Sequence, residues 1–130
     1  MQSYCPRMRV DYNKLVRDRI PEIIGSRGDR AVTRVLDEAA YRDALLAKLV
    51  EEAQEASGAR GEELPAELAD VLEVLQALAK ALGMSWEQLL ALAANKRTRR
   101  GAFEGRISSN TWNKPESALA SLYRLDTTSC

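Results

Sequence analysis

The stretch that decides the fold is residues 38–82, which read EAAYRDALLAKLVEEAQEASGARGEELPAELADVLEVLQALAKAL. Its apolar residues recur every three or four positions on both sides of a polar break, and this spacing predicts two amphipathic helices. Asp37 suits the N-cap of the first helix and Gly58 its end. Pro65 suits the first turn of the second helix, which Gly83 would end. The sequence therefore predicts two central helices that pack antiparallel.

Shorter helices are predicted on both sides of this pair. The apolar residues of 13–26 have helical spacing with an interruption at Pro21, which indicates a short helix or a kinked pair. Ser85 and Gln88 have the spacing of a capping box, so a further helix is expected over 86–99.

Strands play little part in the predicted fold. Residues 31–36 and 103–108 alternate well enough to predict two short strands that would pair as one small ribbon. We therefore predict an all-α fold, an antiparallel helix bundle around the two central helices, with this ribbon as its only sheet. The helical domain is expected over 1–108, followed by a C-terminal tail over 109–130 with a short amphipathic turn at 119–125.

The composition excludes several classes of protein. The 130 residues suit one domain, and 19 basic residues balance 19 acidic ones, which argues against nucleic acid as a partner. The apolar runs are too short to span a bilayer, and the N-terminus lacks the apolar core of a signal peptide. Cys5 and Cys130, read as free thiols, favour a reducing compartment. A cytoplasmic protein with no membrane partner is expected.

The chain contains no histidine, and this limits its chemistry. A Ser-His-Asp or Cys-His nucleophile system is impossible, and so is a zinc site built on histidine. A bound metal would need oxygen ligands, which indicates Mg²⁺, Mn²⁺ or Ca²⁺.

Four carboxylates lie where the two central helices are predicted to meet. Glu52 falls at the edge of the apolar arc of the first helix, with Glu55 one turn further on. Glu67 and Asp70 fall inside the apolar arc of the second. Unpaired carboxylates are costly on a core-facing surface and repel each other, so a divalent cation is the simplest way to hold all four together. The alternative is that they belong to the solvated surface of glutamate-rich helices.

The same residues resemble a known family. The run Lys48-Leu-Val-Glu51-Glu52-Ala-Gln-Glu55, followed by Glu67-Leu-Ala-Asp70, is similar to the EExxE…ExxD signature of the all-α nucleotide pyrophosphohydrolase superfamily. That superfamily includes the MazG proteins, dimeric dUTPases and phosphoribosyl-ATP pyrophosphohydrolase, and the spelling here is closest to the last. The segment 12–24, YNKLVRDRIPEII, also resembles the start of a branch of uncharacterised phosphoribosyl-ATP-pyrophosphohydrolase-like proteins. The resemblance covers residues 12–107 and implies the all-α NTP pyrophosphatase fold.

The resemblance also implies an activity and the residues that perform it. The family cleaves nucleotides between the α and β phosphates and releases a monophosphate and pyrophosphate. Mg²⁺, or Mn²⁺ in its place, would be held by Glu52, Glu55, Glu67 and Asp70. Glu51 and Glu52 would be the catalytic residues, with Glu51 orienting or deprotonating water.

Basic residues that could meet the substrate phosphates form three groups. Lys48 belongs to the motif itself. Lys96, Arg97 and Arg100 follow the last core helix, where the helix dipole also favours cations without any ligand. Lys14 and Arg17 lie three residues apart, so they can share one side of a helix, and ordinary surface charge is their alternative.

The sequence thus predicts a Mg²⁺-dependent pyrophosphohydrolase acting on a nucleoside triphosphate or related nucleotide. Two alternatives stay open, phosphoribosyl-ATP as the substrate and a catalytically silent helical interaction module that binds metal for structure. The apolar arc of residues 65–82, counting its alanines, spans well over half of the helix circumference. One flanking face cannot cover it, so we expect a homodimer or a larger homo-oligomer.

Overall fold

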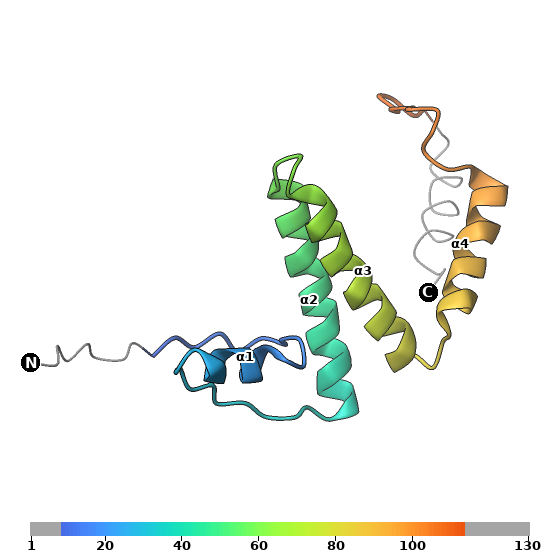
Figure 1. The fold of residues 1–130 in the computed structure, drawn as a ribbon. Helices are drawn as coiled ribbons and strands as arrows, with labels where there is room; N and C mark the ends of the chain where they lie inside the picture. Colours follow the sequence, from blue (N-terminus) through green and yellow to red (C-terminus); the bar gives the residue numbers. More distant parts are fainter. Residues whose placement is uncertain (1–8, 114–130) are drawn as a thin grey trace, which may run out of the picture. The chain divides into compact units, whose positions relative to one another are not determined.

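The computed structural model describes residues 9–113 and contains only helices and connecting segments there (Figure 1). In chain order these helices are α1 (Ile20–Ser26), α2 (Glu38–Gly58), α3 (Leu64–Ala81) and α4 (Trp86–Arg100). The predicted all-α fold is confirmed. The amphipathic turn predicted at 119–125 lies outside the described residues.

The two predicted short strands are wrong, because 31–36 and 103–108 contain no strand. Their apolar side chains find no surface to cover, as Val35 and Phe103 show with exposed fractions of 99% and 95%. A two-stranded ribbon is marginal unless one of its faces packs against something else. The alternation of apolar and polar residues in these two segments therefore does not stabilise a pair of strands.

The ends of α2 and α3 follow the local signals in the sequence. The Asp37 carboxylate accepts a hydrogen bond of 2.8 Å from the backbone N–H of Ala40, which caps α2. Pro65 lies in the first turn of α3, where its missing N–H costs nothing. Gly83 follows α3 with φ of 72°, a left-handed conformation that glycine adopts without strain.

The two central helices pack against each other as a hairpin, and no other pair of described helices makes such a contact (Figure 1). Their shared core is built on Leu45 of α2 and on Val74 and Leu78 of α3. Partly buried apolar residues complete it, namely Leu15, Tyr41, Leu49, Ala77 and Ala81. Leu15 comes from the segment before α1, so that segment is fixed to the hairpin by apolar packing.

The first helix is shorter than predicted. α1 begins at Ile20 rather than near Asn13, and Pro21 lies in its first turn. Proline at this place starts a helix instead of kinking one, because its fixed φ suits the first turn. Residues 13–19 are consequently not helical, and Asn13 adopts a left-handed φ of 44°.

The last described helix begins as the sequence predicted. The Ser85 N–H donates to Gln88 Oε1 at 2.9 Å, and the Gln88 N–H donates to Ser85 Oγ at 3.1 Å, so the capping box is confirmed.

The chain divides into two compact units, Met1–Ala93 and Ala94–Cys130. The predicted domain 1–108 with its tail stays a prediction, since most of that tail lies outside the described residues. None of the helices in 9–113 is long and apolar enough to cross a membrane.

Candidate metal centre

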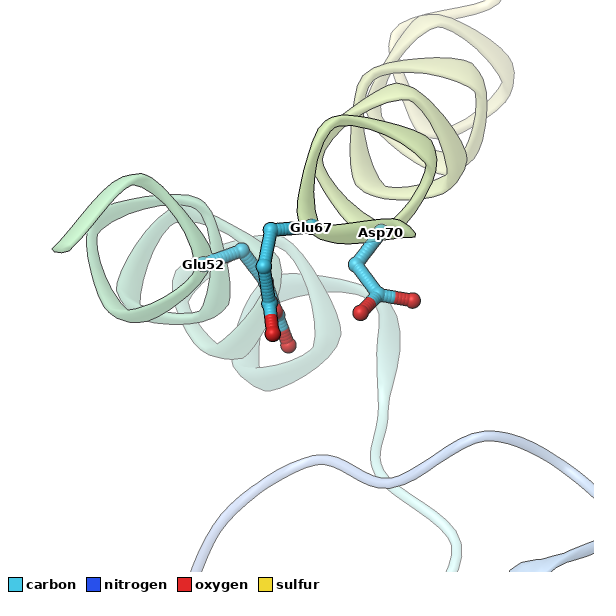
Figure 2. Close-up of side chains that lie close together, drawn as sticks. All are labelled: Glu52, Glu67 and Asp70. Carbon is cyan, nitrogen blue, oxygen red and sulfur yellow. The ribbon is translucent and has the colours of Figure 1, made fainter. Parts of the chain in front are cut away.

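Three of the four predicted metal ligands meet between α2 and α3. Glu52 of α2 and Glu67 and Asp70 of α3 each offer one carboxylate oxygen, and these oxygens lie within 4.8 Å of one another. Figure 2 shows the carboxyl groups of these residues, the carboxylate cluster, pointing to one side of the two helices. Oxygens bound to one Mg²⁺ or Ca²⁺ at about 2.0–2.6 Å can be at most about 4–5 Å apart, so the spacing fits a shared cation.

Two oxygens of the carboxylate cluster are buried without a hydrogen-bond donor. Glu52 is the one buried polar or charged residue in the described part of the chain, with 7% of its surface exposed. Within residues 9–113, its Oε2 atom has no hydrogen-bond partner, and neither does Oε2 of Glu67. A buried polar atom left without a partner is costly, on the order of 1–3 kcal/mol for an uncharged group and more for a charged one. A cation among these carboxylates would remove that cost.

The electrostatics of Glu52 point the same way. Burial is the largest cause that raises the pKa of Glu52, and the charges of Glu55 and Asp70 raise it further. Lys48 opposes them, because its Nζ lies 3.3 Å from Glu52 Oε1. One lysine at one oxygen does not balance the site, so Glu52 is held in an environment that disfavours its own charge.

Glu55 lies outside the carboxylate cluster. Its side chain is exposed on α2, and its described effect on the site is the repulsion of Glu52. On a helix, Glu55 is displaced by about 60° from Glu52 toward solvent. The role of all four residues as ligands stays a prediction, and of these four only Glu52, Glu67 and Asp70 place oxygens within 4.8 Å of one another.

Three basic side chains, Lys14, Arg17 and Lys48, pair with carboxylates in and beside the cluster. Lys14 Nζ donates to Glu51 Oε1 at 2.6 Å, and Lys48 Nζ donates to Glu51 Oε2 at 3.4 Å. Arg17 Nη2 donates to Asp70 Oδ1 at 2.5 Å. Lys14, Arg17 and Lys48 were predicted to bind substrate phosphates; in this structure each pairs with a carboxylate, and their binding of phosphates stays a prediction.

The predicted catalytic pair, Glu51 and Glu52, shares Lys48, whose Nζ lies 3.4 Å from Glu51 Oε2 and 3.3 Å from Glu52 Oε1, but the pKa values of the two carboxyl groups shift in opposite directions. The hydrogen bond from Lys14 is the largest cause that lowers the pKa of Glu51, and Lys48 adds to it. Glu51 is consequently held as a carboxylate, ready to accept a hydrogen bond from water but weak as a base. The reciprocal hydrogen bond raises the pKa of Lys14.

The segment that carries Lys14 and Arg17, residues 9–19, is called the opening segment below. Leu15 packs against the shared core of α2 and α3, so the residues on either side of it reach Glu51 and Asp70. Sequence reasoning missed these ion pairs, because it treated the segment as helical. The signal present was charge complementarity, since two basic residues of the opening segment, Lys14 and Arg17, flank an apolar pair that includes Leu15.

The remaining predicted phosphate ligands belong to a different part of the chain. Lys96, Arg97 and Arg100 lie in the last two turns of α4, within the unit that begins at Ala94. That unit is described by itself, so their participation in the site stays a prediction. Comparisons of the chain with protein-family models, curated proteins and solved structures found no match.

Proposed function

We propose that this protein is a Mg²⁺-dependent nucleotide pyrophosphohydrolase that cleaves its substrate between the α and β phosphates. The observation that carries the metal site is the pair of buried oxygens without donors, Glu52 Oε2 and Glu67 Oε2, beside the Asp70 carboxylate. Lys14, Arg17 and Lys48 leave these two oxygens unsatisfied, so a cation from outside the protein fits there. The nucleotide part of the proposal is supported by the resemblance of the motif over residues 48–70.

The residues of the chain divide the work according to their positions. Glu52, Glu67 and Asp70 would hold the ion, which when bound would polarise phosphoryl oxygens and lower the pKa of a bound water. Lys14 and Lys48 lie at the edge of the cluster, where they can meet the negative charge of a phosphate chain. Glu51 would orient the attacking water, because both lysines hold it ionised.

Pyrophosphate release tests this proposal. The parent should release pyrophosphate from at least one member of a panel of nucleoside triphosphates, deoxynucleoside triphosphates and phosphoribosyl-ATP, with Mg²⁺ or Mn²⁺ but not with EDTA. Glu67→Gln should lower the rate by about 100-fold or more. Glu73→Gln is the matched control, since Glu73 is an exposed residue of the same helix that does not belong to the carboxylate cluster.

The panel also separates the alternatives. Activity confined to phosphoribosyl-ATP would assign the substrate to that compound. A parent that binds Mg²⁺ but hydrolyses nothing in the panel would favour the silent metal-binding module and contradict the proposed enzyme. Equal rates for the Glu67 and Glu73 variants would remove the metal site from the mechanism.

A homo-oligomer in the cytoplasm is part of the same proposal. Leu46 and Val50 of α2 are exposed, and so are Leu68 and Leu72 of α3. Each of these four residues comes directly after a residue that lies on the side of its helix facing the other helix. In two antiparallel helices, residues at such positions point to the same face of the helix pair. This face is the one opposite the opening segment, and a second copy of the chain would cover it.

The mass of the protein in solution tests the oligomer. Sedimentation at micromolar concentration should give a dimer or larger species for the parent and a monomer for Leu68→Glu. A matched change on an exposed polar position, Gln76→Glu, should leave the mass unchanged. A monomeric parent would contradict this part of the proposal without affecting the metal site.

A further inference from the structure

The opening segment places an arginine on one of the three carboxylates that would hold the cation. Arg17 bonds to Asp70, and the contact lies at the surface, where 56% of the Arg17 side chain and 38% of the Asp70 side chain are exposed. We propose that Arg17 changes partner during the reaction, binding Asp70 while the carboxylate cluster is empty and a substrate phosphate once a divalent cation has taken Asp70. This inference rests on the proposed function and adds the residue that couples binding of the cation to binding of the substrate phosphate.

Arg17 and a divalent cation compete for Asp70. The cation would draw one oxygen from each of Glu52, Glu67 and Asp70, and these oxygens already lie within 4.8 Å. A guanidinium that stays on Asp70 would then lie close to the double positive charge of this cation, and the guanidinium and the cation would repel each other. The proposed exchange resolves this competition by moving Arg17 from Asp70 to another anion.

The opening segment keeps Arg17 within reach after it leaves Asp70. Leu15 remains packed against the core, and the Ile20 N–H donates to the Arg17 carbonyl oxygen at 3.0 Å, which fixes the backbone at the start of α1. The side chain can therefore rotate toward the ion while its backbone stays in place. Its planar fork of donors matches the oxygens of a phosphate, and phosphates are the groups that a nucleotide brings to the cation.

Lys14 provides the contrast within the same segment. Its partner is Glu51, which does not belong to the carboxylate cluster, so a cation bound there does not compete directly for it. The exchange of partners is thus assigned to Arg17 and not to every base near the site.

Two binding measurements on the full chain test the exchange. Mn²⁺ affinity is measured without phosphate from the electron paramagnetic resonance of free Mn²⁺, and affinity for inorganic pyrophosphate is measured calorimetrically in excess Mg²⁺. Arg17→Gln should bind Mn²⁺ about 2- to 10-fold more tightly than the parent, because its competitor is gone. The same variant should bind pyrophosphate about 10-fold more weakly or worse, because a charge-assisted donor is lost. Arg17→Lys should fall between the two.

The matched control is Arg19→Gln, which removes the same charge two residues away from an exposed pair with Glu22. It should change neither affinity. A merely structural Arg17 predicts weaker binding of both ligands, and a bystander predicts values equal to those of Arg19→Gln. Either result overturns the exchange, while the proposed function survives if the parent binds both ligands. A parent that binds no Mn²⁺ overturns both.

Discussion

The inner and outer sides of the acidic site are built in opposite ways. On the outer side, Glu51 and Asp70 are bonded to Lys14 and Arg17 of the opening segment. On the inner side, between α2 and α3, the Oε2 atoms of Glu52 and Glu67 are buried and have no donor. Lys48 reaches only one oxygen of the inner side, Glu52 Oε1, so among the described residues the two buried Oε2 atoms, where burial makes a charge expensive, are left without a donor. This difference is what a site for an exchangeable cation requires.

The largest expected effect is on the rate of pyrophosphate release, when one carboxylate of the inner side and one of the outer side are neutralised separately. Glu52→Gln should lower kcat for pyrophosphate release by about 1,000-fold, because the ion loses its most buried ligand. Glu51→Gln should lower it less, by about 10- to 100-fold, because the ion stays bound and only the orientation of water suffers. Rates at saturating Mg²⁺ decide between them, and a reversed order would show that the inner side is not the metal centre.

The second effect concerns melting without metal. In EDTA, Glu67→Gln should melt at or above the parent, by up to about 5 °C, since it removes repulsion and a buried charge. Asp70→Asn removes repulsion but also releases Arg17 from an exposed ion pair, so its melting temperature should stay within about 2 °C of the parent. Added Mg²⁺ should then stabilise the parent more than either variant, because only the parent keeps all three ligands. Calorimetric melts with and without metal make the comparison, and a large loss for Glu67→Gln in EDTA would contradict it.

The third effect is a dependence on pH with two windows of opposite sign. Burial raises the pKa of Glu52, so the folded metal-free protein binds this proton more readily than the unfolded chain. Its stability should rise as the pH falls from 7 through the raised pKa of Glu52 toward the ordinary value of 4.5. Below that value, Lys14 keeps the pKa of Glu51 low, so stability should be lost as Glu51 takes up its proton.

Melts in EDTA across this range check the sign. Glu52→Gln should remove the rise above pH 4.5, and Glu51→Gln should reduce the loss below it. A parent whose stability falls steadily from pH 7 downward would mean that Glu52 is balanced by the protein after all.

The smallest effect belongs to the outer side alone. Lys14→Gln should lower the metal-free melting temperature by about 1–2 °C at low salt, because its partner Glu51 is partly exposed. In about 1 M salt the difference should vanish, since charges at the surface are then screened over about 3 Å. If the melting temperature of Lys14→Gln stays below that of the parent in high salt, the pair of Lys14 with Glu51 is not a screened surface contact.

The parts of the molecule that were predicted correctly depend on neighbours in the sequence. Asp37, Pro65 and Gly83 mark helix ends through their own backbone and side-chain chemistry, so the hairpin could be inferred from local signals. Helical periodicity likewise placed Glu52 and Glu67 on facing surfaces, because packing two apolar arcs leaves few choices of register.

The parts that were not predicted depend on distant contacts. The alternation in 31–36 indicates a strand only if another strand pairs with it, and none of the described segments does. From the sequence, Pro21 could end a helix or begin one. In the structure Leu15 packs against the hairpin, and the residues before Ile20 are not helical. The pairing of Arg17 with Asp70 also depends on this packing, which the spacing of residues 12–24 does not reveal.

The position of the opening segment in the chain has a consequence for the order of folding. The hairpin of α2 and α3 closes through a short loop, so its carboxylates are brought together early. The cations that oppose them arrive across 37 residues in the pair of Lys14 with Glu51 and across 53 in the pair of Arg17 with Asp70. Contacts of such separation form slowly, so we expect a stage of folding at which the acidic groups and Lys48 have met and Lys14 and Arg17 have not yet arrived. If the carboxylate cluster binds a divalent cation, that cation should therefore accelerate refolding in stopped-flow experiments as well as slow unfolding.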